Sequence, residues 1–153
     1  MIDILRIATR TSALALWQAN YIAKAITSIH KNIKVELVEI VTKGDKWLDG
    51  PLHEIGGKGL FIKELEQALL EGRADIAVHS VKDIPAIIPE GFCLPILGFR
   101  ESYLDMLVGC ESLESLPEFA VVGSSSLRRK IQLLAIRPDL NVRNIRGNVD
   151  TRL

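Results

Sequence analysis

The residues best suited to chemistry follow a short apolar run in "RADIAVHSVKDIP", residues 73–85. Here Lys82 and Asp83 place a cation and a carboxylate side by side, directly after a segment typical of a buried strand. In an extended backbone, neighbouring side chains point to opposite sides, so a simple ion pair between the two is not expected. A single carboxylate in a cationic, partly dry cleft can stabilise a positively charged intermediate or move protons. We therefore take Asp83 as the candidate acid rather than as part of a solvated turn.

Basic residues recur at four predicted helix starts: Arg10 before 12–30, Lys58 before 60–72, Arg128 and Arg129 within 126–138, and Arg146 and Arg152 in "IRGNVDTRL". A helix N-terminus already carries partial positive charge, so helix electrostatics alone disfavours cations there. Free backbone N–H groups and guanidinium groups aimed at one place form an anion site. The run Ser124-Ser125-Ser126 adds hydroxyl donors, where an N-cap needs only one serine. These features predict a polyanionic ligand with carboxylates or phosphates.

The elements that must position these residues alternate along the chain. Apolar patterning predicts helices over 12–30, 60–72 and 126–138, and strands over 4–9, 34–42, 74–80, 105–110, 119–125 and 141–145. This alternation indicates an α/β fold, in which ligands bind at the carboxyl edge of the sheet. We predict two domains, 1–99 and 100–153, with the ligand between them. The Gly-rich connection 43–59 is long enough to suggest a mobile cover over the site.

Composition excludes several function classes. The 153 residues include 19 basic and 19 acidic side chains, so the net charge gives no reason to expect nucleic acid or an acidic membrane as partner. The sequence lacks the run of about 20 apolar residues that a membrane helix needs. The first residues do not form a secretory signal, which favours a cytoplasmic location.

Other motifs are informative by what they lack. "GGKG" does not have the spacing of a phosphate-binding P-loop, so nucleotide binding is not supported. Cys93 and Cys110 lack the paired spacing of zinc or redox motifs, and we expect two buried, reduced thiols. Three scattered histidines argue against a metal site, so none is predicted.

At these motifs the chain resembles the porphobilinogen deaminase family, also called hydroxymethylbilane synthase. The resemblance covers all 153 residues through "LRIATRTSALALWQA", "VTKGD", "GGKGLFIKELEQALLEGRADIAVHSVKDIP", "VGSSSLRRKIQL", "RPDL" and "IRGNVDTRL". It implies a cytosolic transferase of porphyrin and haem biosynthesis that joins four porphobilinogen molecules head to tail, releases ammonia and gives the linear tetrapyrrole hydroxymethylbilane. It also implies a monomer with a periplasmic-binding-protein-like architecture and a site between two domains.

The resemblance implies roles for matching positions. Asp83 is expected to contact pyrrole N–H groups and to stabilise the azafulvenium-like cation left after deamination. Arg10 and Ser12 are expected to hold cofactor and substrate side chains, and Arg146 and Arg152 to hold the carboxylates of porphobilinogen and of the growing polypyrrole chain. The other expected cofactor-binding residues are Lys58, Ser80, Lys82, Ser124, Ser125, Ser126, Arg128, Arg129, Arg146 and Gly147.

One feature of the family is not matched. Its dipyrromethane cofactor is attached to a cysteine in a third, C-terminal domain, and neither cysteine of this chain lies in a matching context. The chain is therefore expected to be a fragment, inactive alone. The alternative is a non-catalytic domain of the same cleft architecture that binds an anionic ligand, which explains the cations but not the acid facing them.

Overall fold

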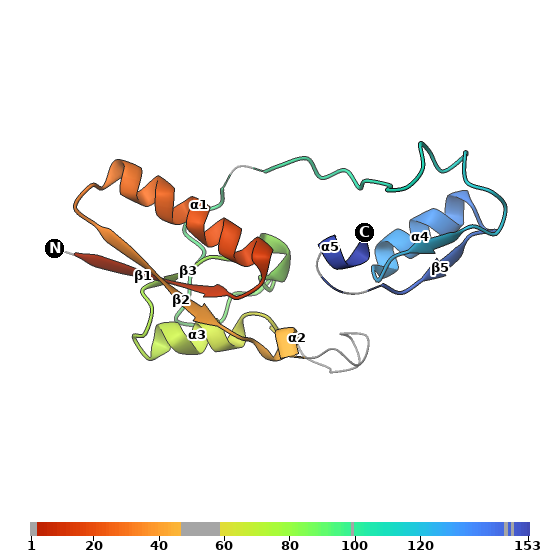
Figure 1. Ribbon diagram of the computed structural model, residues 1–153. Helices are drawn as coiled ribbons and strands as arrows, with labels where there is room; N and C mark the ends of the chain where they lie inside the picture. Colours follow the sequence, from red (N-terminus) through yellow and green to blue (C-terminus); the bar gives the residue numbers. More distant parts are fainter. Residues whose placement is uncertain (1–2, 47–58, 99, 146, 148) are drawn as a thin grey trace. The chain divides into compact units, whose positions relative to one another are not determined.

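The computed structural model of this chain describes residues 3–46, 59–98, 100–145, 147 and 149–153 (Figure 1). The chain forms two compact units, Met1–Pro95 and Ile96–Leu153. Both contain small parallel sheets with helices between the strands, which confirms the predicted α/β class. The assignment of 1–99 and 100–153 as domains stays a prediction. None of the helices in the described ranges is long and apolar enough to cross a membrane.

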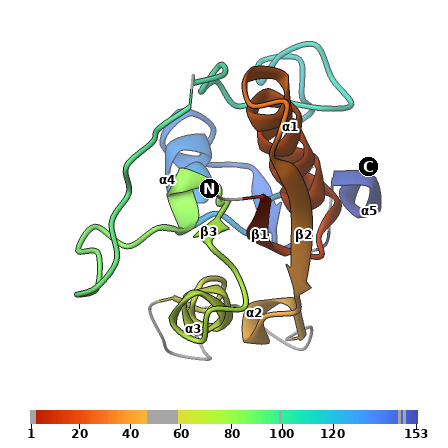
Figure 2. The ribbon, with the colours of Figure 1, turned by 90° about the vertical axis from the view of Figure 1, so that its left-hand side faces the viewer.

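The first unit is built on a three-stranded parallel sheet in the order β2-β1-β3, with β1 at Ile4–Arg10, β2 at Lys34–Ile40 and β3 at Ile76–Ala77. Parallel neighbours need a crossover between them, and α1 (Ala13–Ile29) and α3 (Lys63–Leu70) serve as crossovers. These two helices lie on opposite faces of the sheet (Figures 1 and 2). The sheet of the first unit is therefore covered on both sides.

The central strand β1 explains where the core of this unit lies. Ile7, Ala8 and Thr9 are fully buried one after another, because both faces of β1 are covered. Ala8 packs with Leu65 of α3 and with Ala74, just before β3. This packing fixes the end of β1, and hence the position of Arg10.

Capping residues set the helix ends in the first unit. Ser12 is the predicted N-cap of α1, and its Oγ accepts a hydrogen bond from the Ala15 backbone N at 3.4 Å. The predicted helix 60–72 is shorter than expected, because residues 59–62 form a turn and α3 begins at Lys63. Gly72 follows α3 with a φ of 67°, the left-handed conformation that glycine adopts readily.

The second unit contains the parallel pair β4 (Val121–Gly123) and β5 (Asn141–Arg143), joined through α4 (Leu127–Ile136) and followed by α5 (Val149–Arg152). The strands predicted over 119–125 and 141–145 are present but shorter. The predicted strand 105–110 is wrong, because this segment has no regular secondary structure. A strand needs a hydrogen-bonding neighbour, and in the described residues no strand pairs with it.

Candidate functional site

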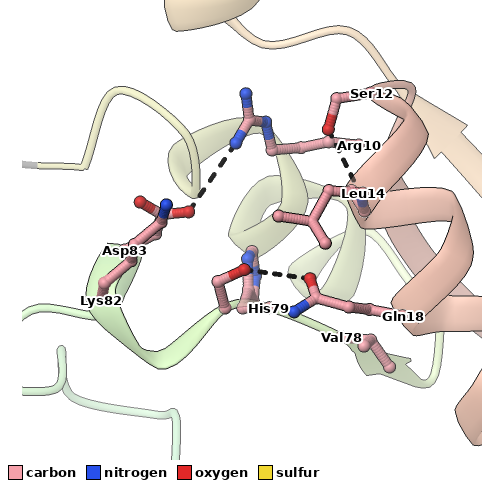
Figure 3. Close-up of a pocket in the computed structure, with 10 residues that line it drawn as sticks. Arg10, Ser12, Leu14, Gln18, Val78, His79, Lys82 and Asp83 are labelled. Carbon is pink, nitrogen blue, oxygen red and sulfur yellow. Dashed lines mark hydrogen bonds and ion pairs between the residues drawn. The ribbon is translucent and has the colours of Figure 1, made fainter. Parts of the chain in front are cut away.

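A pocket lies at the carboxyl ends of β1 and β3 in the first unit (Figure 3). Its lining contains several residues predicted from the sequence, together with a histidine, a glutamine and an apolar wall. The lining residues are Arg10, Ser12, Leu14, Ala15, Gln18, Val78, His79, Ser80, Lys82 and Asp83. The predicted acid and the predicted cation Arg10 therefore share one pocket, although they lie far apart in the sequence.

Asp83 is brought into this pocket by a short 3-10 turn, η1 (Val81–Asp83), in which its backbone N donates to the Ser80 carbonyl at 2.9 Å. Its Oδ2 lies 3.7 Å from Arg10 Nη1, and both side chains are only 19% exposed. No donor in the described part of the chain hydrogen-bonds to the Asp83 carboxylate. Both carboxylate oxygens are therefore available to accept hydrogen bonds from a ligand.

The guanidinium of Arg10 contacts two other side chains of the protein, Asp45 and Phe61. Its Nε donates to both carboxylate oxygens of Asp45 at 3.2 Å, and its Nη2 also donates to Asp45 Oδ1. The Phe61 ring covers one face of the guanidinium, with its centroid 4.1 Å from Cζ. In this structure Arg10 contacts two protein carboxylates, and its predicted role in binding ligand anions stays a prediction.

Asp45 comes from α2 (Lys43–Lys46), and the sequence interpretation did not include it. Thr42 donates to Asp45 Oδ2 from its backbone N at 3.1 Å and from its Oγ at 2.8 Å. Burial alone raises the pKa of Asp45, but hydrogen bonds from Arg10 and Thr42 outweigh burial and hold this pKa below its usual value. The Thr-x-x-Asp spacing of residues 42–45 is close to a capping box and is the signal that could have identified Asp45.

His79 and Gln18 are two further lining residues that sequence reasoning missed. Gln18 accepts a hydrogen bond from Ser80 Oγ at 3.0 Å, which ties the chain after β3 to α1 (Figure 3). Burial lowers the pKa of His79, the Asp83 carboxylate opposes this effect, and the Arg10 charge adds to it, so the imidazole is neutral at pH 7. The pocket therefore contains a neutral imidazole beside its carboxylate.

Lys82 differs from Arg10 in its surroundings. It is exposed and forms no ion pair with the described residues. Because η1 is a tight turn, Lys82 and Asp83 are not alternating residues of an extended strand, and Asp83 pairs with Arg10. Lys82 is thus a cation at the pocket that a ligand carboxylate can reach.

The second unit contains the predicted serine run, and its serines hold the local backbone. Ser126 is the N-cap of α4 and accepts from the Arg129 backbone N at 3.4 Å. Ser124 Oγ accepts from the Ser126 backbone N at 3.2 Å, and Ser125 Oγ donates to the Ile145 carbonyl. Each serine therefore has a structural partner, and the run does not need a ligand to explain it.

The two arginines of α4 have different partners. Arg129 Nη2 lies 2.6 Å from Asp105 Oδ1, and its Nε donates to the same oxygen at 2.9 Å. Arg128 is exposed and has no ion-pair partner among the described residues. In this unit Arg128 is thus the more accessible of the two for an anion.

The remaining predicted residues lie at the end of the chain or outside the described ranges. Gly147 has a φ of 110°, and its carbonyl accepts from Arg152 Nε at 2.8 Å. A Cβ at position 147 would lie 2.7 Å from Thr151 Cβ, so both conformation and space favour glycine there. Lys58 and Arg146, as well as most of the predicted cover over 43–59, lie outside the described residues.

Cysteines and metal ligands do not extend the site. Both cysteines are free, but Cys93 is exposed and Cys110 is half-buried, so the expectation of two buried thiols is wrong. Cys93 lies in a segment without helix or strand, which leaves its side chain uncovered. Within the described residues, no group of three or more His, Cys, Asp or Glu side chains is placed to hold a metal ion.

A comparison with protein families adds independent information. Residues 5–153 match the family model described as "Porphobilinogen deaminase, dipyromethane cofactor binding domain". The match extends over almost the whole chain and includes every motif on which the resemblance rests. The chain therefore belongs to the porphobilinogen deaminase family and corresponds to its domain that binds the dipyrromethane cofactor.

Proposed function

We propose that this chain provides the catalytic pocket of a hydroxymethylbilane synthase. In this proposal four porphobilinogen molecules are condensed head to tail, with release of ammonia, to give hydroxymethylbilane. The observation that carries the proposal is the state of Asp83: a mostly buried carboxylate, paired in charge with Arg10, whose two oxygens accept no hydrogen bond from the described residues.

The residues of the pocket fit a dipyrrole with acidic side chains. Pyrrole N–H groups need an acceptor, which the open Asp83 carboxylate supplies. Carboxylate side chains need cations, and Lys82 supplies an accessible one beside the pocket. Leu14, Ala15 and Val78 supply an apolar wall for the rings. Once bound, the cofactor supplies the pyrrole carbon to which the first porphobilinogen is joined.

Asp83 has the charge that the reaction requires. When porphobilinogen loses ammonia, positive charge develops on its pyrrole, and a fixed carboxylate in a partly dry site stabilises that charge. Arg10 is shared between Asp45 and Asp83, so its single positive charge offsets only part of the negative charge of these two carboxylates. Burial lowers the pKa of His79 and so disfavours a further positive charge beside Asp83.

The attachment of the cofactor and the domain architecture follow the pattern of the family in this proposal. Neither cysteine lines the pocket, so we propose that the cofactor is attached to a cysteine outside these 153 residues and that the chain is inactive alone. We also propose the periplasmic-binding-protein-like architecture, with the predicted domains 1–99 and 100–153 sharing one ligand. A monomer in the cytoplasm, acting without nucleic acid or membrane, completes the proposal.

Intact-mass measurement tests this function. The full protein that contains this sequence is produced in a host that makes haem, and its mass is compared with that of the polypeptide. We expect a covalent dipyrrole adduct, and release of ammonia when porphobilinogen is added. Absence of both would contradict the proposal and favour the non-catalytic domain that binds an anionic ligand.

A further inference from the structure

The guanidinium of Arg10 is held from two sides by residues of two different segments, α2 and the turn 59–62. Asp45 accepts hydrogen bonds from Nε and Nη2, and the Phe61 ring covers one face. Nη1 is left to face Asp83 at 3.7 Å (Figure 3). The two carboxylates thus take different edges of one planar cation.

The backbone around Asp45 is built to hold this arrangement. Gly44 is buried against the Phe61 ring, and a Cβ at this position would come closer than 3.0 Å to three ring atoms. The Gly44 backbone N donates to the Leu60 carbonyl at 3.1 Å, and the Lys43 backbone N donates to Glu64 Oε1 at 3.0 Å. The first bond joins α2, which carries Asp45, to the turn 59–62, which carries Phe61, and the second joins α2 to α3.

Asp45 and Asp83 compete for the same cation. An arginine fork binds a carboxylate most strongly through two parallel hydrogen bonds, and Arg10 makes such a contact with Asp45. Without Asp45, the same edge of the guanidinium could turn to Asp83. Asp83 would then accept two protein hydrogen bonds on the oxygens that a pyrrole N–H has to reach.

We propose that Asp45 is a positioning residue, which holds Arg10 so that Asp83 is balanced in charge while its oxygens stay open. This inference rests on the proposed function, since it assigns the open oxygens to the pyrrole N–H groups of cofactor and substrate. Phe61 supports Asp45 by fixing the plane of the guanidinium.

The Asp45→Asn variant of the full protein tests this role. We expect kcat to fall by about 10- to 100-fold, the cost typical of a small misplacement of a reacting group, while KM changes by less than about twofold. A crystal structure of the variant should show Arg10 within hydrogen-bond distance of Asp83. Asp75→Asn is the matched control, because Asp75 holds Arg6 through a similar fork away from the pocket, and its loss should leave kcat unchanged.

A double-mutant cycle separates positioning from a structural role. In an Arg10→Lys background the fork cannot form, so adding Asp45→Asn should change kcat by less than about threefold. An equal loss in both backgrounds would overturn the proposal, as would an Asp45→Asn enzyme with unchanged kcat or with Arg10 unmoved. If Asp45→Asn does not fold, Phe61→Leu replaces it, and we then expect a kcat loss of at least about threefold that disappears in the Arg10→Lys background.

Failure of the positioning role of Asp45 can be distinguished from failure of the proposed synthase function. If the wild-type protein carries no dipyrrole and releases no ammonia, the function is wrong whatever Asp45 does. The position of Arg10 in the two crystal structures still reports whether Asp45 holds it. An active wild type with an unaltered Asp45→Asn variant contradicts the positioning role alone.

Discussion

Arg10 Nη1 lies 3.7 Å from Asp83 Oδ2, which is close enough for attraction between charges and too far for a hydrogen bond. This separation lets the protein place a carboxylate in a mostly buried position without using its hydrogen-bonding capacity. A nearby opposite charge offsets part of the desolvation of Asp83. The oxygens remain open for donors on a ligand, which is the property that the proposed chemistry needs.

Replacing Asp83 by asparagine removes the charge with little change in shape. We expect kcat to fall by at least about 10²-fold, the usual cost of losing a group that stabilises charge in the transition state. Because no described donor hydrogen-bonds to this carboxylate, the urea midpoint of unfolding should stay close to that of the wild type. Turnover of the full protein near the wild-type value would show that Asp83 is not the acid.

Much of the first unit could be predicted from the sequence, because its signals are local. The spacing of apolar residues indicated β1, α1 and β2, Ser12 marked the start of α1, and Gly72 marked the end of α3. Of the strand predicted over 74–80, only Ile76–Ala77 forms β3. By contrast, the prediction of a strand over 105–110 was wrong. Its apolar residues fit a strand, but pairing depends on a neighbouring strand that the sequence pattern does not reveal.

In the pocket, too, some residues could be predicted from the sequence and others could not. Asp83 and Arg10 could be singled out because Arg10 ends β1 and Asp83 follows β3, both at the carboxyl edge of the sheet. The contacts of Arg10 with Asp45 and Phe61 could not be predicted, because they depend on how α2 packs against the turn 59–62, where Gly44 lies against the Phe61 ring. The backbone partners of the three serine hydroxyls could not be predicted from the sequence either, and the role of these serines in binding the cofactor stays a prediction.

His79 should make the stability of the protein depend on pH. Its folded-state pKa is lowered mainly by burial, so the unfolded chain takes up a proton as pH falls through the ordinary value of about 6.5, while the folded protein does not. We expect the free energy of unfolding to fall between pH 7.5 and 5, by at most about 1.4 kcal/mol per pH unit for this group. Urea unfolding at several pH values measures the effect.

The His79→Gln variant should lose this part of the pH dependence. His30→Gln is the matched control, because His30 is exposed at the end of α1 and lies outside the pocket. The same slope in the wild type and in His79→Gln would show that His79 does not cause the loss of stability.

Arg128 and Arg129 should contribute unequally to holding ligand carboxylates. A charge-assisted hydrogen bond contributes about 1.5–3 kcal/mol, so Arg128→Leu should slow cofactor loading or chain elongation by about 10- to 100-fold. Arg129→Leu should have a smaller effect, because Arg129 is already paired with Asp105. Mass spectrometry of the covalent elongation intermediates would measure both effects.

Asp105→Asn provides the control for this comparison. It should release Arg129 and speed loading in the wild-type background, but it should have no effect beside Arg129→Leu. Distributions of elongation intermediates that match the wild type in both arginine variants would contradict the predicted roles of these residues.

Gly44→Ala should damage the pocket through the Phe61 ring. The added Cβ would lie closer than 3.0 Å to three ring atoms, and Arg10 lies over one face of the ring, so the ring cannot move without disturbing the guanidinium. Overpacking of this kind typically costs about 1–3 kcal/mol. We expect a lower free energy of unfolding and a lower kcat, measured by urea unfolding and by ammonia release in the full protein.

Two further variants show whether the contact with the Phe61 ring causes the losses of stability and kcat expected for Gly44→Ala. Gly98→Ala is the matched control: nothing lies within 4 Å of its Cβ position, so its effect should stay within about 0.5 kcal/mol. Adding Phe61→Leu to Gly44→Ala should restore part of the stability, because the smaller side chain relieves the contact, but it should not restore kcat, because the guanidinium loses the ring that covers it. If Gly44→Ala is as stable and active as the wild type, the ring is not fixed between Gly44 and Arg10, and the support that Phe61 gives to Arg10 is refuted.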